Sequence, residues 1–463
     1  MSNDNQPQES ERKREYWIIS INNKLAEVKK PSQLSIYKVP NKLLKLKEDA
    51  YTPSIVSIGP FHHNNKGMQA FEEHKRRYML HLFMRTSQDE TRHTLLMECA
   101  AAILELEEET RRCYSEKIGL DEYDLAEILL VDGCFLLELF LRYSEIENHE
   151  EGKVEDPLIN NAQTIATLQH DLALLENQIP FSVLETLFQI IKYHLPKALP
   201  FSFTEHNVAT LALLFFKLAL GLSNEAIQRK SSELSGTHLL DILHNFYLPK
   251  YETVNHSEFR ISHKIPQSQD LQRSGLRVCA TKLLKAGIRF AANTADANEN
   301  LLDINFSATG VVTMPPLHIQ EAITETIFRN LIAFEQCGGT GEHHIASYVF
   351  LMRSLLHSSD DVGILRKEGI IKYDFSGEDV TSLFKSICNG VVLYDFYFSK
   401  LREDVNRYYY NMSRWRKWHE YASVLRHDYL SKPWTFISVN TGLIVLILTA
   451  MQTYYTGFPY YHH

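Results

Sequence analysis

The sequence predicts a mainly α fold: a large multi-helix globular body with a small β element and one C-terminal transmembrane helix. Three observations lead to this prediction. Apolar residues recur at helical spacing through most of the 463 residues. Strand-like patterns are few and short. The chain ends in a long apolar stretch that carries no charged side chain.

Residues 1–30 are expected to form a polar N-terminal tail, because Met1–Arg14 (MSNDNQPQESERKR) lacks apolar periodicity and is predicted to be frayed. Residues 31–430 are expected to form the helical body, in two lobes that divide near residues 225–275. The polar stretches 144–156 and 223–237 are predicted to be loops or linkers. Helical patterns cover Met68–Arg85, Thr94–Leu106, Tyr123–Tyr143, Ala162–Glu176, Pro180–Tyr193, Asn207–Leu222, Ile319–Glu335 and His344–His357.

The predicted β element is small. Its strand-like segments are Ile288–Phe290, Leu301–Phe306 and Val311–Thr313, and Gly310 is expected to lie in a turn before the last of them. Three short segments suit a small sheet that is attached to a helical body. They do not suit a sheet that organises the whole fold.

A basic segment precedes the apolar end. Residues 400–432 contain eight Lys or Arg and four Asp or Glu, a local net charge of 8 − 4 = +4. Aromatic and apolar residues at helical spacing here are flanked by the basic residues Arg414, Arg416, Lys417 and Arg426. An amphipathic helix of this kind lies on an anionic membrane surface or docks on the body, and the sequence leaves both possibilities open.

Residues 433–454 are predicted to be the transmembrane helix, because about 20 apolar residues span the roughly 30 Å hydrocarbon core of a bilayer. Lys432 and Trp434 at one end and Tyr454 at the other are expected to anchor the helix in the two interfaces. Asn440 is polar, but its side chain can bond within the helix or to a partner. Residues 455–463 would form a short tail. The alternative is a buried helix of the core.

The predicted localisation is that of a tail-anchored, single-pass membrane protein whose body is cytosolic, with the lipid bilayer as a partner. The N-terminus has no apolar segment typical of a signal peptide. The excess of Lys and Arg before the span places that side in the cytosol. The sequence does not distinguish the plasma membrane from the endoplasmic reticulum.

Charge and cysteine content exclude several classes of protein. The net charge is −9, and no basic face with interleaved aromatics runs through the body, so no nucleic-acid partner is expected. The six cysteines include no CxxC pair. Several stand in apolar runs, which favours reduced, buried thiols over disulfides.

No cofactor or metal ion is predicted. His62, His63, His74 and His81 are close in sequence, but the zinc-binding arrangement HExxH is absent. Residues 338–341 (GGTG) lack the lysine of a phosphate-binding loop, and no GxSxG nucleophile motif occurs. No motif in the sequence therefore identifies a catalytic residue.

Three carboxylates in or beside apolar helices, Asp132, Asp171 and Glu176, are the catalytic alternative, since burial can raise a carboxyl pKa into the range of acid–base chemistry. The structural alternative is that they pair with cations or backbone groups. Glu176, Asn177 and Gln178 (ENQ) are well suited to bind backbone groups at a helix junction.

Several motifs together resemble one known family, the plant "domain of unknown function 247" family, in the family's order and over about residues 34–457. That resemblance implies a plant membrane protein with a mostly helical body and a C-terminal transmembrane helix, and it implies no established catalytic activity. The motifs are SIGPFHH (Ser57–His63), EEHKRRY, VDGCFLLELF (Val131–Phe140), DLALLENQIPF (Asp171–Phe181), FRNLIAFEQC (Phe328–Cys337) and the terminal KPWTFIS and LTAMQTYY.

Two main functions remain open, and a lipid-surface sensor built on the basic segment is a third. The first is a membrane-tethered, non-enzymatic recognition or scaffold protein whose helical surface binds a protein partner. The second is a membrane-tethered enzyme that acts on a small or lipid-like substrate through Asp132, Asp171 or Glu176. A deep pocket lined by two of these carboxylates and a histidine would favour the enzyme. Carboxylates that are fully paired would favour the scaffold.

Overall fold

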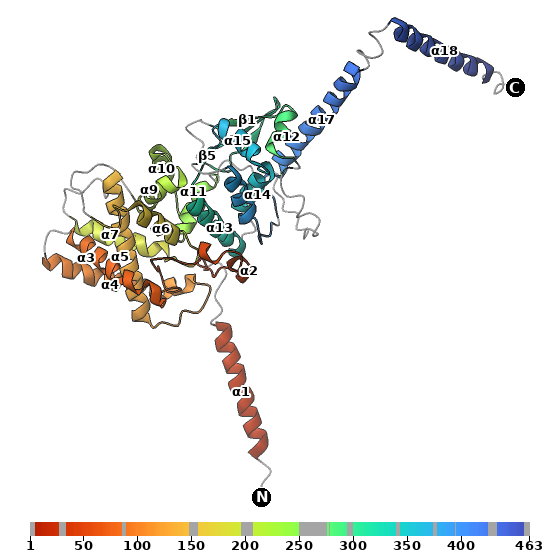
Figure 1. Cartoon of the computed structure of the whole chain (residues 1–463). Coiled ribbons are helices and arrows are strands. Elements are labelled where there is room, and N and C mark those ends of the chain that lie inside the picture. The colour runs from red at the N-terminus through yellow and green to blue at the C-terminus, as the bar shows by residue number, and fades with distance from the viewer. Residues whose placement is uncertain are drawn as a thin grey trace.

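The computed structural model describes residues 5–26, 34–85, 89–147, 156–195, 207–249, 276, 278–293, 300–338, 343–373, 377–393, 395–424 and 433–457. Figure 1 shows a helical body from which α1 (Asn5–Ala26) extends at one end and α17 (Ser399–Val424) and α18 (Pro433–Gly457) extend at the other. The sequence predicts a frayed tail where α1 begins. Glu, Gln, Arg and Lys dominate this stretch, and their helix propensities are high even without apolar periodicity.

The first half of the body is helical in all its regular elements that the structure describes. These are α2 (Asn41–Leu44), the 3₁₀ helices η2 (Glu48–Ala50) and η3 (Lys66–Phe71), α3 (Glu72–Met84), α4 (Asp89–Cys113), α5 (Glu122–Glu147), α6 (Ala162–Leu172), α7 (Phe181–His194), α9 (Val208–Leu220), α10 (Asn224–Ser231) and α11 (Leu239–Tyr247).

The second half mixes helices with short strands. Its elements are α12 (Ala280–Lys285), β1 (Arg289–Ala292), β2 (Asn305–Phe306), β3 (Val311–Met314), β4 (Leu317–Ile319), α13 (Glu321–Cys337), α14 (His344–Leu355), α15 (Ser359–Lys367), β5 (Ile371–Tyr373) and α16 (Gly377–Ile387). The prediction of a mainly helical body with a small β element is confirmed.

Helix α5 lies at the centre of the first half, in contact with α3, α4, α7 and α9. Its residues are buried almost continuously from Leu125 to Ser144, which explains why its sequence is apolar on every face. A Cβ atom on Gly133 would lie 2.5 Å from Leu187 Cδ1 of α7. The glycine therefore lets α7 pack closely against α5.

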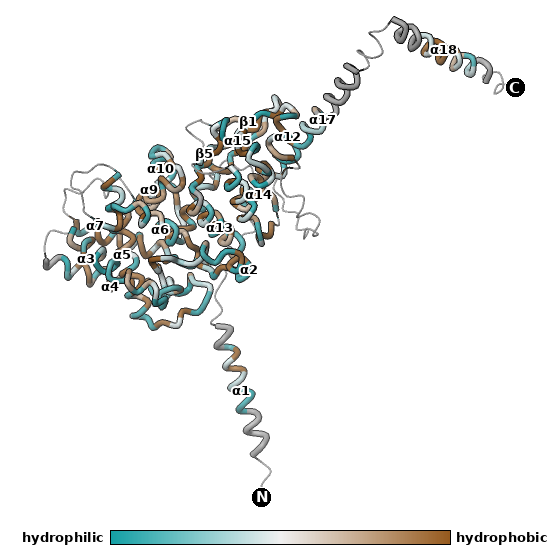
Figure 2. The backbone as a smooth tube through the Cα atoms, in the orientation of Figure 1, coloured by the Kyte–Doolittle hydropathy of each residue, from teal (hydrophilic) through white to brown (hydrophobic). Residues whose placement is uncertain are grey.

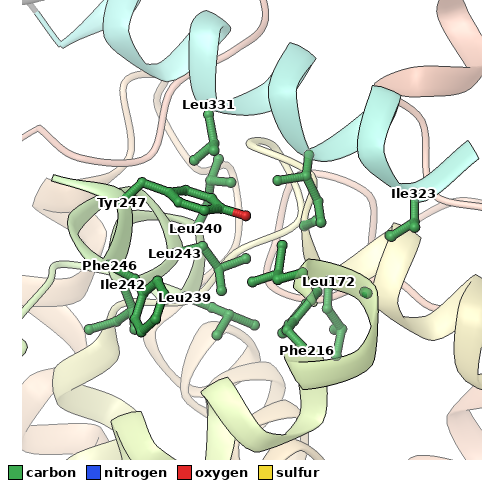
Figure 3. Packing of buried hydrophobic residues seen from close by; sticks show 14 of the residues in the cluster. Leu172, Phe216, Leu239, Leu240, Ile242, Leu243, Phe246, Tyr247, Ile323 and Leu331 are labelled. Carbon is green, nitrogen blue, oxygen red and sulfur yellow. The ribbon is translucent and has the colours of Figure 1, made fainter. Parts of the chain in front are cut away.

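Helix α13 organises the second half and joins it to the first, because it contacts α6, α11, α14 and α16. Figure 3 shows α11 side chains, including Leu240 and Tyr247, packed between Leu331 of α13 and Leu172 and Phe216 of α6 and α9. The buried apolar residues of both halves form one connected cluster. The division into two lobes near residues 225–275 stays a prediction.

Two small sheets complete the body. In the first, β3 pairs with β1 in parallel and with β2 in antiparallel register. Gly310, which precedes β3, has a φ of +79°, so the predicted turn at this glycine is confirmed. In the second sheet, β4 pairs with β5 in parallel, and each strand has three residues. The sequence analysis did not predict this second sheet.

The two stretches predicted as loops are partly helical. Helix α5 continues to Glu147, and α10 occupies Asn224–Ser231. The side chain of Ser223 accepts a hydrogen bond from the Ala226 amide and caps α10. Ala226 and Ile227 are buried. The apolar content of α10 is too low for its sequence to indicate this packing.

The predicted C-terminal transmembrane helix is wrong. In the described part of the chain, no helix has both the length and the apolar character to cross a membrane. Polar residues on both sides of the apolar run Leu443–Leu448 lower the mean hydropathy of α18. In Figure 2, hydrophobic colour is likewise confined to a short stretch of the coloured part of α18. Thr441 precedes this run, and Thr449 and Gln452 follow it.

The predictions that depended on that helix are corrected with it. These are the single-pass, tail-anchored membrane localisation with a cytosolic body and the transmembrane helix implied by the family resemblance. Of the proposed anchor and basic residues, Lys432 and Arg426 lie outside the described residues. Arg414, Arg416 and Lys417 fall on α17 and Trp434 and Asn440 on α18, where the structure does not describe their side chains. Tyr454 lies on α18 and is exposed.

Candidate functional site

Two of the three candidate carboxylates, Asp171 and Asp132, bind the backbone of residues 54–59, a segment that overlaps the start of the motif Ser57–His63. Asp171, at the end of α6, is fully buried. Its Oδ1 accepts a hydrogen bond from the Ser54 amide at 2.8 Å. Its Oδ2 accepts hydrogen bonds from the Ile55 and Val56 amides at 2.7 and 2.9 Å. One carboxylate therefore binds three successive backbone N–H groups.

Asn177 continues this binding along the segment. Its Oδ1 accepts a hydrogen bond from the Ile58 amide at 2.7 Å. Its Nδ2 donates to the carbonyl oxygens of Val56 and Asp171 at 3.0 and 2.9 Å. Because the segment pairs with no strand here, the Asn177 amide replaces a sheet partner for its backbone.

Gln178 holds the junction between α6, α7 and α11. Its Nε2 donates to the carbonyl oxygens of Leu172 and Leu174 at 2.9 and 2.8 Å, and its Oε1 accepts a hydrogen bond from the Leu240 amide at 3.1 Å. The side chains of the ENQ motif were expected to bind backbone groups at a helix junction, and these contacts confirm that expectation.

Asp132 of α5 binds both a cation and the end of the same segment. Its Oδ1 accepts a hydrogen bond from Lys75 Nζ at 2.7 Å, and its Oδ2 accepts one from the Gly59 amide at 2.7 Å. Lys75 is fully buried and also lies 2.6 Å from Glu72. Burial raises the pKa of Asp132, against the opposing effects of Lys75 and the Gly59 amide.

Gly59 is required by its backbone and by its surroundings. Its φ is +74°, a conformation in which a side chain is strained. A Cβ atom there would lie 2.5 Å from the carbonyl oxygen of Gln178. Tyr114 Oη donates a hydrogen bond to that same oxygen at 3.1 Å. The glycine therefore permits the close approach of residues 54–59 to the α6–α7 junction.

Glu176 binds a second segment of backbone. Its Oε1 accepts a hydrogen bond from the Val39 amide at 2.8 Å, and its Oε2 accepts one from Lys38 Nζ at 2.8 Å. His62 Nε2 lies 3.4 Å from Oε2. Burial alone raises the pKa of Glu176, but His62, Lys38 and the Val39 amide stabilise its anion and together hold the pKa below its usual value.

We call Asp132, Asp171, Glu176, Asn177 and Gln178 the backbone-binding cluster. Each of the six carboxylate oxygens of its three acids accepts a hydrogen bond from the protein. Asp132 borders a cavity of about 280 Å³ that His63, Glu72 and Arg76 also line. Asp171 and Glu176 do not line that cavity. The cluster thus places Asp132 and Asp171 on residues 54–59 and Glu176 on residues 38–39, and only Asp132 among them lines this cavity.

The sequence analysis did not identify some residues that contact the backbone-binding cluster. Lys75 and Gly59 stand in the motifs EEHKRRY and SIGPFHH, yet nothing in the spacing of those motifs indicates that Asp132 joins them. Asn330 of the FRNL motif also binds backbone: its Oδ1 accepts a hydrogen bond from the Leu175 amide, and its Nδ2 donates to the Ala50 carbonyl. The order of the family motifs was the one available signal that these residues act together.

The histidines do not gather around a common point. Among the residues that the structure describes, no group of three or more His, Cys, Asp or Glu side chains is arranged to hold a metal ion. His62 lies against Glu176, whereas His74 packs on the ring of Phe71 with 5.3 Å between ring centroids.

Comparisons with known proteins agree with the motifs. A family model described as "Plant protein of unknown function" (DUF247) matches residues 36–448. UPF0481 protein At3g47200 of Arabidopsis thaliana is 29% identical over 436 residues, which cover 90% of this chain and 85% of that protein. Putative UPF0481 protein At3g02645 of the same plant is 24% identical over 523 residues, which cover 95% of this chain and 94% of that protein. No solved structure matches this chain.

Proposed function

Because this chain belongs to the DUF247 family of plant proteins, whose function is unknown, we propose its role from its own residues: a non-enzymatic recognition or scaffold protein that binds a protein partner on its helical surface. The observation that carries this proposal is what the oxygens of the three candidate carboxylates bind. All their oxygens are occupied by backbone amides or lysines, so they serve the fold. Fully paired carboxylates are the arrangement expected of a scaffold.

The outer face of α4 supports the proposal and suggests where a partner binds. Met97 and Leu104 are 61% and 37% exposed. They are seven residues apart, so they lie on one face of the helix, and the exposed residues Ala100 and Ala101 lie between them. Exposed apolar residues that continue along one helix face are typical of protein-binding surfaces.

The charges beside this face suggest the chemistry of the partner. At 100° per residue, Glu98, Glu105 and Glu109 fall in a row along one flank of the Met97–Leu104 face. A complementary partner is an amphipathic helix with an apolar face and a flank of Lys or Arg, since opposite charges across an interface favour encounter and fix orientation.

Proximity labelling in plant cells tests this surface. Met97→Asp together with Leu104→Asp is expected to remove the labelled partner proteins, because two charges would be placed in the apolar contact. The matched control is Leu284→Asp on α12, where the native leucine is 45% exposed. The proposal predicts that the control retains the full set of partners. Equal loss or equal retention by the two variants would reject α4 as the binding surface.

One observation favours the enzyme as a second candidate. Burial raises the pKa of Asp132, and the cavity beside it is also lined by His63, whose buried Nδ1 has no hydrogen-bond partner. An acid–base pair would need these properties. Incubation of the purified protein with plant extract, followed by mass spectrometry, tests this. Depletion of a metabolite by the native protein but not by a folded Asp132→Asn variant would favour the enzyme over the scaffold.

A further inference from the structure

A second polar cleft lies away from the backbone-binding cluster, between α3, α5 and the residues that follow Asp156. Its volume is about 440 Å³, within the 300–1,000 Å³ that is usual for small-molecule sites. Four polar residues of α3, at spacings of three, four and seven, face it: His74, Arg77, Tyr78 and His81. The other lining residues are Met84, Arg85, Glu138, Arg142, Glu145, Asp156, Pro157 and Leu158.

The acidic groups of this cleft are already occupied. Arg85 donates to both oxygens of Glu138 and to both oxygens of Glu145. Arg142 donates to Glu138 and Asp156. Asp156 also accepts hydrogen bonds from Tyr78 Oη at 2.8 Å and from the Leu158 amide at 2.9 Å. Each of the six carboxylate oxygens therefore has at least one donor, so the cleft has few free acceptors for a cationic ligand.

The donors of the cleft are only partly used. In the described part of the chain, Arg77 has one polar contact, at 3.1 Å from its Nη2 to Glu73 Oε1. His74 packs against the Phe71 ring, and within the described residues neither His74 nor His81 forms a hydrogen bond. Arg142 uses its Nε and Nη1 atoms on carboxylates and stacks on the Tyr78 ring with 4.7 Å to the centroid. The unused hydrogen-bonding capacity of the cleft thus consists mainly of N–H groups.

We propose that this cleft binds a small organic anion, a phosphate or carboxylate group with an apolar portion. The charged group is recognised by Arg77, His81 and His74 along α3. Its oxygens accept hydrogen bonds and donate none, which complements the free N–H groups. The apolar portion lies against Met84, Pro157 and Leu158. This site is independent of the protein-binding surface proposed on α4.

The charges of the lining are balanced and do not oppose the binding of an anion. Arg77, Arg85 and Arg142 balance Glu138, Glu145 and Asp156, three charges against three. The lining contains no carboxylate beyond those three. The lining therefore has no excess negative charge that would repel an anion, and the anion gains from the unused N–H donors.

Isothermal titration calorimetry on the full chain tests the proposal with four probes: inorganic phosphate, phenyl phosphate, benzoate and benzylamine. We expect saturable binding of phenyl phosphate or benzoate, and weaker binding of inorganic phosphate because it lacks the apolar portion. The phosphate and benzoate arms identify which anionic group the cleft prefers. Absence of saturable binding by every anion, or binding of benzylamine as tight as that of the anions, would overturn the proposal.

A matched pair of arginines locates the binding. Arg77 and Arg112 are 50% and 48% exposed, and each pairs with an exposed glutamate four residues earlier in its helix. Arg77→Gln is expected to weaken binding about tenfold, since it removes a hydrogen bond to a charged group. Arg112→Gln is expected to leave binding unchanged. Equal weakening by the two variants would mean that general surface charge attracts the anion, and the cleft would be rejected as the site.

His81→Leu and His93→Leu give an independent second pair, because both histidines are exposed and only His81 lines the cleft. The proposal requires weaker binding by the first variant alone. Far-UV circular dichroism and thermal melting of all four variants verify that they fold. Neither Arg85 nor Arg142 is substituted, because their ion pairs hold α3, α5 and Asp156 together.

Discussion

At the scale of single residues, the buried acids and amides of this protein act mainly on backbone. Residues 54–59 belong to no helix or sheet, yet residues 56–59 are buried, and buried N–H and C=O groups need partners. The side-chain oxygens of Asp171 and Asn177 accept hydrogen bonds from four backbone N–H groups of that segment. The sequence allowed the ENQ side chains to be assigned to backbone binding. It did not allow the partners of Glu176 and Asn177 in residues 38–58 to be named, because these lie more than a hundred residues away along the chain.

Asp171→Ala is expected to lower the free energy of unfolding by roughly 2–4 kcal/mol, because it removes the acceptor of three backbone N–H groups, of which that of Val56 is buried. Urea denaturation followed by circular dichroism measures the change. The control is Glu185→Ala, which removes an exposed carboxylate from α7 and is expected to change stability by less than about 0.5 kcal/mol. A similar small effect of both variants would contradict the role assigned to Asp171.

The contacts of Glu176 lead to a prediction about the stability of the protein at low pH. Because its pKa in the folded protein is below the usual value, its anion stabilises the fold fully above the unfolded-state pKa of about 4.3. That contribution is lost as the pH falls through the folded-state pKa. Glu176→Gln removes the titrating group. The difference in unfolding free energy between native protein and variant is therefore expected to be largest at pH 7 and to shrink toward pH 3.

Urea titrations of both proteins at pH 7, 5 and 3.5 measure this difference, with Glu185→Gln as the control for the general effect of removing a carboxylate. A difference that stays constant over this range would show that Lys38 and the Val39 amide do not favour the charged form of Glu176.

At the scale of elements, the sequence predicted the long helices well and the short elements poorly. The apolar pattern of α5 and α9 extends over many residues, and burial of those residues is what the structure shows. Strands β4 and β5 have three residues each, too few for an alternating pattern. The end of the chain was misjudged for a different reason: α18 is helical, but polar residues interrupt its apolar run.

Two helix glycines give predictions of opposite sign. Gly133→Ala in α5 is expected to destabilise the protein by about 1–3 kcal/mol, since its Cβ would overlap Leu187 of α7. Gly363→Ala lies inside α15, where a Cβ meets nothing within 4 Å. There alanine is expected to stabilise the protein by about 0.5–1 kcal/mol through its higher helix propensity.

Thermal and urea unfolding of the two glycine variants side by side measure both signs with the same substitution. If Gly133→Ala were neutral, the α5–α7 packing would tolerate an added methyl group, and the close approach of the two helices would not depend on glycine.

At the scale of the whole molecule, contacts between distant parts of the chain connect its two halves. Lys47 Nζ lies 2.6 Å from Glu325 of α13. His244 of α11 lies 3.0 Å from Glu335, whose oxygens also accept hydrogen bonds from the first amides of α14. Together with the single connected core, these contacts favour cooperative unfolding of the body over independent unfolding of two predicted lobes.

Native-state hydrogen exchange tests this cooperativity, because it reports the opening free energy of each element separately. With rising urea, the slowest amides of α5 and of α13 are expected to converge on one opening free energy, since breaking either half exposes core shared with the other. Tryptophan fluorescence cannot replace this measurement, because all four tryptophans (Trp17, Trp415, Trp418 and Trp434) lie in α1, α17 or α18. Opening of α13 at a distinctly lower free energy than α5 would instead establish two independent lobes, and the connection through Lys47 and His244 would be too weak to couple them.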